Sequence, residues 1–264
     1  MTRGSTSQLR LRVFAGPNGS GKSTVIQRIK NTKSEGRLID FGHYINADDI
    51  AVALLKDGVS FKSFEIKVTN SEFKRVALAS GLVNAEFPEA CFSESYFIRK
   101  NVLKLKDKGQ NERVAQIIAD FLRKKLLEER KKFSFETVFS HPSKLDLMRE
   151  AAAAGYKVYL YFVSTESPQI NIFRVEARAK KGGHNVPRDK IISRYYRSLE
   201  LLYAASQVAY QAYFFDNSKD GEDFEMFAHF KLIKKRKMWD HIDNDTIPVW
   251  FRKYYSEKIV SRRK

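Results

Sequence analysis

Residues 16–23, Gly-Pro-Asn-Gly-Ser-Gly-Lys-Ser, carry the strongest chemical signal in the sequence. They fit the G-x-x-x-x-G-K-[ST] pattern of a loop that binds phosphate. The glycines let the backbone turn tightly around an anion, and N–H groups of the loop and of the following helix then hold phosphate oxygens. The pattern predicts that Lys22 reaches the β- and γ-phosphates of ATP and that the Ser23 hydroxyl binds Mg²⁺. The expected nucleotide-binding residues are Gly16, Asn18, Gly19, Ser20, Gly21, Lys22, Ser23 and Thr24.

The candidate for activating an acceptor hydroxyl is Asp48, which follows a predicted short strand at 43–47. Ligands of open α/β sheets bind at the carboxyl ends of the strands. A carboxylate there can accept the hydroxyl proton while the oxygen attacks. Asp49 is the weaker candidate for the same role, and either side chain has the alternative role of a helix N-cap.

Glu136 is the second candidate carboxylate, because it lies within the predicted buried strand 133–139. A charge in such a strand is costly unless it is paired or close to the strand's end. We therefore expect Glu136 to contact substrate or the Mg²⁺ shell; the alternative is an edge strand with Glu136 facing water. Asn46 and Asp216 also lie at or near the carboxyl ends of strands and are candidates to converge with it.

Candidate cations follow in two predicted helices. Arg174 and Arg178 are four residues apart and share a helix face, and Arg194 and Arg197 lie on the next helix. A Gly-Gly-His loop that ends at His184 connects the two helices. This helix–loop–helix is predicted to close over phosphates, since guanidinium groups bind oxyanions bidentately. For each arginine the alternative is a surface salt bridge, and His184 is either a substrate contact or an ordinary loop residue.

The elements that must position these residues alternate between strand and helix. Strands are predicted at 10–15, 43–47, 133–139, 158–163 and 213–215. The near-continuous apolar run 158–163 is typical of a strand in a parallel sheet. The alternation predicts an α/β fold with a parallel sheet of about five strands and helices on both faces. We expect one domain over residues 9–220, a helical insert at 57–132 and a basic helical C-terminal extension at 221–264.

The charge of the chain favours anionic partners. The net charge of +17 fits nucleotides, phosphosugars, nucleic acid or a membrane surface. Residues 231–264 contain eleven Lys or Arg against four acids, which indicates either a solvated appendage or a contact with nucleic acid or an acidic partner. The single cysteine, Cys91, excludes an internal disulfide and suits a reducing compartment. No secretory signal and no apolar run long enough to span a membrane is found, so a cytoplasmic location is expected.

The phosphate loop is also similar to that of ABC-type ATPases. Such motors carry a Leu-Ser-Gly-Gly-Gln signature and an Asp-Glu pair after four apolar residues, and this sequence has neither. There is also no Cys/His cluster with the spacing of a zinc site. A hydrolytic motor is therefore disfavoured.

Taken in order, the motifs resemble the zeta-toxin family of P-loop kinases over about residues 9–218. They are the phosphate loop, Ile45–Ala51, Phe135–Thr137, Gly155–Val158, Arg174–Arg178, Gly182–Pro187, Arg194–Leu199 and Asp216–Ser218. The resemblance implies a kinase-like fold that moves the γ-phosphoryl group of ATP to a hydroxyl of a small nucleotide-like substrate. In characterised toxins of the family that substrate is UDP-N-acetylglucosamine, and an antitoxin protein is a candidate partner.

The resemblance also assigns roles. Lys22 and Ser23 match the family's phosphate-loop residues, and Asp48 matches its general base. Glu136 and Thr137 match a substrate-contacting region in the third strand. Arg174 or Arg178 matches a phosphate-binding arginine, and Arg194 is the best candidate for a second one in the lid. Two alternatives stay open: a nucleic-acid-associated ATPase that uses the basic tail, and a nucleotide-binding module without turnover.

Overall fold

The computed structural model describes residues 8–34, 36–182, 185–242 and 247–261. The chain forms two compact units, one of residues 1–41 and 136–264 and the other of residues 42–135. The boundaries of these units, after residues 41 and 135, differ from the expected ones at 57, 132 and 220.

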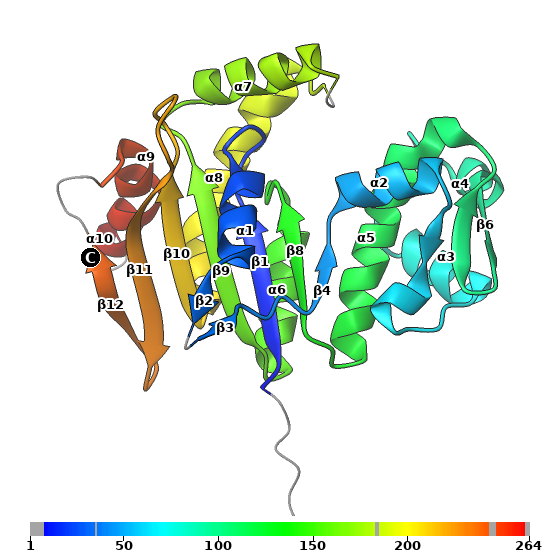
Figure 1. Cartoon of the computed structure of the whole chain (residues 1–264), viewed down its shortest axis with the longest axis horizontal. Coiled ribbons are helices and arrows are strands. Elements are labelled where there is room, and N and C mark those ends of the chain that lie inside the picture. Colours follow the sequence, from blue (N-terminus) through cyan, green and yellow to red (C-terminus); the bar gives the residue numbers. More distant parts are fainter. Residues whose placement is uncertain (1–7, 35, 183–184, 243–246, 262–264) are drawn as a thin grey trace, which may run out of the picture. The chain divides into compact units, whose positions relative to one another are not determined.

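The first unit contains a sheet whose strands lie in the order β12-β11-β10-β9-β1 (Figure 1). Strands β1 (Arg10–Ala15), β9 (Lys157–Ser164) and β10 (Gln211–Asp216) pair in parallel. Strands β11 (Glu225–Ile233) and β12 (Arg236–Ile242) continue the sheet in antiparallel pairing. The parallel part confirms the α/β class expected from the apolar run in β9.

Helices cover both faces of this sheet, as predicted. Helix α1 (Lys22–Lys30) contacts β1 and β9 and lies in front of the strands in Figure 1. Helices α6 (Ser143–Ala153) and α8 (Arg188–Val208) contact β9 from behind. Helix α7 (Pro168–Lys180) packs on α8, and the short strands β2 (Lys33–Ser34) and β3 (Arg37–Leu38) form a ribbon of their own.

The C-terminal segment differs from the helical extension that we expected. Residues 225–242 form the β11–β12 hairpin, and only then follow α9 (Val249–Phe251), the π-helical turn η3 (Arg252–Ser256) and α10 (Glu257–Ser261). The physical reason is that the aromatic residues of this segment favour strands and stabilise the fold when they are buried. The aromatic side chains Phe227, Phe230, Trp250, Phe251 and Tyr255 are all buried, so this segment is part of the core and not a solvated appendage.

The second unit contains β4 (His43–Ile45), which pairs in parallel with β8 (Phe133–Thr137). The expected helices of the segment are present: α2 (Ala47–Leu55), η1 (Phe61–Phe64), α3 (Asn70–Leu78), α4 (Glu89–Ser95), η2 (Lys108–Gln110) and α5 (Asn111–Glu128). A three-stranded sheet in the order β5-β7-β6 was not expected; it comprises β5 (Val59–Ser60), β7 (Val102–Leu105) and β6 (Tyr96–Arg99). The core of the second unit contains ring contacts among Phe61, Phe73, Phe92, Tyr96 and Phe121.

Within the described ranges, no helix has the length and apolar character needed to cross a membrane.

Lys237 on β12 is a cation held against aromatic rings. Its Nζ donates to Tyr255 Oη at 3.2 Å and to Ser206 Oγ at 3.3 Å, and it lies 4.6 Å from the centre of the Phe230 ring. Burial lowers the pKa of Lys237 to about 8. Between that pH and the pKa of an unfolded lysine, about 10.4, the folded protein binds fewer protons than the unfolded chain. Folding is therefore penalised at neutral pH and favoured as the pH rises through this window.

Lys237→Met is therefore expected to raise the free energy of unfolding at pH 7 by roughly 1 kcal/mol, after allowance for the partial exposure of the ammonium group. It should also flatten the increase of stability between pH 8 and pH 10. Urea unfolding across that range measures both effects. Lys253→Met, on the exposed side of η3, is the matched control and should change neither quantity.

Candidate phosphate-binding site

The loop between β1 and α1 has a backbone that only glycine accommodates at Gly16, Gly19 and Gly21, of which the first and last are the tightest. Gly16 has φ of 145°, and a Cβ there would lie 2.0 Å from the carbonyl oxygen of Val163. Gly21 has φ of 91°, and a Cβ there would lie 2.1 Å from Asn217 Nδ2. The loop therefore has the tight turn that the sequence pattern predicts.

The N-terminus of α1 suits an anion. Gly21 is its N-cap without a side-chain bond, and the first turn contains no acidic residue, so the positive end of the helix dipole is not compensated locally. Lys22 is buried, and its Nζ donates to the carbonyl oxygen of Pro17 at 3.0 Å. Asn18 Oδ1 and Ser20 Oγ are buried without a hydrogen-bond partner among the described residues. These features fit a phosphate group bound at this helix end.

Glu136 lies at this helix end as well. Its Oε1 accepts from Ser23 Oγ at 3.4 Å and is 3.9 Å from Lys22 Nζ, and the carboxylate side chain is only 16% exposed. The alternative of Glu136 facing water is therefore wrong. A hydroxyl and a carboxylate are the hard oxygen ligands that Mg²⁺ prefers. Across the described ranges no group of three His, Cys, Asp or Glu side chains that could hold a metal ion is found, so a Mg²⁺ ion here would depend on this pair together with phosphate oxygens and water.

Two further predicted residues have mainly structural contacts. Thr24 is exposed on the first turn of α1, and its N–H donates to the Gly21 carbonyl oxygen at 3.1 Å. Thr137 Oγ1 accepts from the Phe139 N–H at 3.1 Å. Their assignment to nucleotide and substrate, respectively, stays a prediction.

Asn217 is a site residue that we did not single out from the sequence. Its Nδ2 donates to the Ser20 carbonyl oxygen at 2.9 Å, and its backbone N–H donates to the Ser164 carbonyl oxygen at 2.9 Å. The neighbouring Asp216, which we expected in the site, instead accepts from Trp250 Nε1 and Ser218 Oγ, both at 2.8 Å. The polar run directly after the last parallel strand was the available signal, but it did not show which side chain turns toward the loop.

Arg174 connects α7 to the segment after β10. Its guanidinium donates to the Asn217 carbonyl oxygen at 2.6 Å, to Asp220 Oδ1 at 2.6 Å and to the Lys219 carbonyl oxygen at 3.2 Å. These bonds hold α7 beside the residue that supports the phosphate loop. Arg174 thus connects these two segments in this structure, and its predicted role in phosphate binding stays a prediction.

Arg194 is the predicted arginine best suited to receive an anion. It is half-buried on α8, and burial together with the like charge of Arg197 lowers the pKa of its guanidinium. Within the described ranges no carboxylate is paired with it. Arg178 is exposed on α7, and His184 lies outside the described residues.

Asp48 belongs to the second unit, in the first turn of α2. The N-cap is Asn46, whose Oδ1 accepts from the Asp48 N–H at 2.8 Å, so the alternative that Asp48 or Asp49 caps the helix is wrong. Both carboxylates are exposed. The role of Asp48 as a general base stays a prediction.

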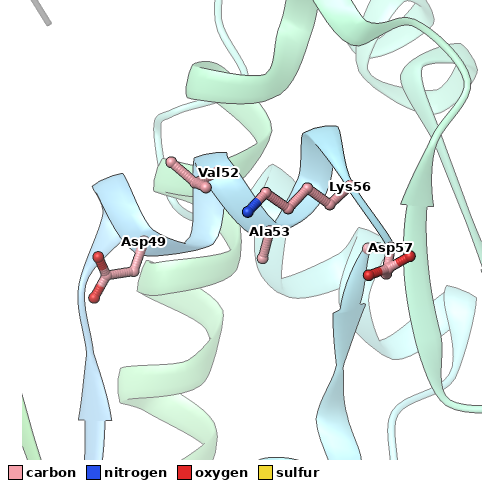
Figure 2. Close-up of a pocket in the computed structure, with 6 residues that line it drawn as sticks. Asp49, Val52, Ala53, Lys56 and Asp57 are labelled. Atoms are coloured by element: carbon pink, nitrogen blue, oxygen red, sulfur yellow. The ribbon is translucent and has the colours of Figure 1, made fainter. Parts of the chain in front are cut away.

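The face of α2 that follows Asp48 is hollowed by a recess of about 400 Å³. Figure 2 shows Asp49, Val52 and Lys56 along this side of the helix. Ala53, Asp57 and Gly58 complete the lining. The second unit thus has a small recess of its own next to the predicted base, with both apolar and charged residues in its lining.

Gly21→Ala is expected to weaken nucleotide binding at least tenfold. The new methyl group would be placed at a positive φ and against Asn217 Nδ2, so either the loop or the supporting amide must move. Isothermal calorimetry with a non-hydrolysable ATP analogue measures the loss. Gly155→Ala is the control, because Gly155 also has a positive φ, of 86°, but has nothing within 4 Å of the added Cβ. Equal ATP affinities in the two variants would contradict the loop assignment.

The sequence profile described as Zeta toxin matches residues 103–219, a range that begins after the phosphate loop. An uncharacterised protein of Haemophilus influenzae is 33% identical over 63 residues, which cover 24% of this chain and 45% of that protein. The chain thus spans less than half of this relative in the alignment.

Two solved structures are similar to this chain at low identity. The AvrRxo1-ORF1:-ORF2 complex with ATP is 18% identical, with a TM-score of 0.47, over 89% of this chain and 61% of that chain. The toxin–antitoxin system PezAT of Streptococcus pneumoniae is 14% identical, with a TM-score of 0.44, over 82% of this chain and 70% of that chain. This chain therefore corresponds to about three fifths of the AvrRxo1 protein.

The family match covers the parallel strands β8, β9 and β10, the helices α7 and α8, and the support residue Asn217. The phosphate loop, residues 16–23, lies outside the match, whereas Glu136 and Asn217 lie within it. The match therefore shows a similarity to zeta toxins over residues 103–219, and the structure shows an α/β fold with a mostly parallel sheet.

Proposed function

We propose that this protein is an ATP-dependent phosphotransferase that moves the γ-phosphoryl group of ATP to a hydroxyl of a small nucleotide-like substrate. The observation that supports this most directly is the placement of Lys22 Nζ and Ser23 Oγ beside Glu136 at the uncapped N-terminus of α1. A binding module without turnover would not need a buried lysine and a carboxylate at the phosphate end of the site.

Each proposed role follows from a side chain's chemistry. Lys22 would bind the β- and γ-phosphate oxygens, and Ser23 with Glu136 would hold Mg²⁺, which supplies charge neutralisation on the phosphates. The acceptor oxygen attacks the γ-phosphorus while the bond to the β-phosphate oxygen breaks. ADP leaves, and the acceptor proton passes to the Asp48 carboxylate. Arg194 on α8 and Arg178 on α7 would stabilise the charge that develops on the transferred group.

We propose the class of acceptor from the similarity to zeta toxins. Zeta toxins phosphorylate UDP-N-acetylglucosamine, so a nucleotide sugar is the first acceptor to test, and an antitoxin is the proposed protein partner. The net charge of +17 suits an anionic acceptor.

Incubation with γ-labelled ATP, Mg²⁺ and a panel of nucleotides and nucleotide sugars tests the proposal. We expect one class of acceptor to gain a single phosphoryl group, detected by mass, and Lys22→Met to abolish the product. Release of inorganic phosphate without any labelled acceptor, also when a cell metabolite extract is supplied, would contradict it. Phosphate release stimulated by nucleic acid would favour the alternative of a nucleic-acid-associated ATPase.

A further inference from the structure

The sheet of the first unit has two chemically different faces. One face is apolar and buried, with Leu11, Val13, Leu160, Phe162 and Phe214 in contact with the core. Because side chains alternate along a strand, the other residues share the opposite face. The register places Phe14, Tyr161, Tyr213 and His229 in one row on it, and Arg12, Tyr159, Gln211 and Lys231 in the next.

Five cations lie on this second face. They are Arg10, Arg12, Lys157, Lys231 and Arg236, on four of the five strands. Within the described ranges none of them forms an ion pair with a carboxylate, although many other lysines and arginines of the chain do. The acidic side chain Asp240 is already bonded to His229 Nδ1. The face therefore has a strong, uncompensated positive charge.

Arg12 is the clearest example of a cation on this face that has no carboxylate partner. Its side chain is buried, with 7% of the residue exposed, and it has only neutral partners. Its Nε donates to the Asp40 carbonyl oxygen at 2.9 Å, its Nη1 donates to Tyr161 Oη at 2.8 Å, and its guanidinium lies 4.4 Å from the centre of the Tyr159 ring. A buried guanidinium without a carboxylate is costly. An anion that approaches this face would offset that cost.

The aromatic row presents ring edges. Tyr161 and Tyr213 stack at 4.7 Å with an interplanar angle of 3°, and His229 stacks on Tyr213 at 4.1 Å. Rings that stack between neighbouring strands stand upright on the sheet, so their polar edges face away from it. Tyr213 Oη, which donates to Gln211 Oε1 at 2.6 Å, lies at such an edge. Phe14, Tyr161 and His229 are themselves buried, so the polar groups that the row and its neighbour offer are the Tyr213 hydroxyl and the Gln211 amide.

Part of this face remains accessible. Phe41 stacks on Phe14 at the β1 side, and α1 covers the end near the phosphate loop. In Figure 1 no helix or strand is drawn in front of β11 and β12. Tyr159, Gln211 and Lys231 are partly exposed, and Arg236 is exposed.

We propose that this face binds single-stranded nucleic acid, with phosphates on Arg10, Lys157, Lys231 and Arg236 and riboses or base edges on Tyr213 and Gln211. A flat sheet face with a positive track and polar aromatic edges fits a single strand, whereas reading a duplex requires an element that enters a groove. The inference does not rest on the proposed phosphotransferase activity, since no residue of the phosphate loop takes part.

Fluorescence anisotropy with a labelled oligouridylate tests it on the full chain. We expect salt-sensitive binding, and we expect the double variant Lys231→Glu/Arg236→Glu to weaken it at least tenfold. The log–log salt slope should fall by about 1.4 for two lost phosphate contacts on a single strand. Lys231→Gln/Arg236→Gln, which keeps polar side chains in the hairpin, should weaken binding in the same direction and guards against misfolding. Thermal unfolding of each variant confirms its fold.

The matched control changes the net charge by the same amount elsewhere. Arg99→Glu/Lys100→Glu alters two exposed cations of the β6–β7 hairpin in the second unit and should change the affinity less than twofold. Lys22→Met should also leave it unchanged. Equal losses in both charge-reversal variants would show a net-charge effect and overturn the proposal. Tighter binding to heparin or to vesicles of anionic phospholipid than to the oligonucleotide would also overturn it.

Discussion

Lys22→Met is expected to lower the rate of phosphoryl transfer by at least about 1,000-fold, because it removes a preorganised charge at the transferring group. Lys22 is buried and lies beside Glu136, so its ammonium group is fixed before ATP binds and cannot be replaced by a mobile neighbour. The loss should appear mainly in kcat, since the N–H groups of the loop still bind phosphate in the variant. Steady-state kinetics with the acceptor found in the panel measures it.

Lys30→Met is the matched control on the same helix. Lys30 lies in the last turn of α1, where its Nζ is 5.7 Å from the centre of the Phe41 ring. Its replacement should change kcat less than threefold. If Lys22→Met kept more than a tenth of the activity, the assignment of Lys22 to the transferring phosphate would have to be abandoned.

Asp48→Asn is expected to lower kcat by about 100- to 10,000-fold, the range typical of a general base. The amide has the same shape but cannot take up the acceptor proton. Binding of ATP should be unchanged, because the proposed role involves only the acceptor. A pre-steady-state measurement of transfer with saturating ATP separates the chemical step from binding.

The neighbouring carboxylate provides the control for Asp48. Asp49→Asn alters the same turn of α2 and the same net charge, and the Asn46 cap that begins the helix stays intact in both variants. We expect Asp49→Asn to lower kcat less than tenfold. The reverse ranking would transfer the role to Asp49, and full activity in both variants would exclude a carboxylate base from this turn.

The parallel part of the fold could be predicted because local patterns and tertiary packing agree there. Strand β1 has the predicted bounds, and Gly155 follows α6 with φ of 86°, as a C-terminal glycine should. Strands β11 and β12 were missed because abundant lysines between aromatic residues masked the alternation of a hairpin. Their pairing with β10 depends on residues far away in the sequence, which no local window contains.

The candidate site could be predicted only where its residues carry a local signal in the sequence. The loop and Glu136 carry local signals: a motif and a charge at the end of a buried strand. Asn217 and Arg174 act through bonds to backbone carbonyl oxygens, and any residue type offers such an acceptor. The sequence therefore gives no signal for the carbonyl groups to which these side chains donate. Only the folded structure shows which side chain supports the loop.

The contact between Trp250 and Asp216 bears on when, during synthesis of the chain, the phosphate loop can be braced. Asp216 precedes Asn217, which holds the phosphate loop, and Trp250 Nε1 holds Asp216. A ribosome releases residues 16–23 early, but the residues that brace them emerge some two hundred positions later. The nascent chain therefore cannot assemble the braced phosphate loop until most of the chain has been synthesised, so we expect an unfinished product to lack the proposed nucleotide binding.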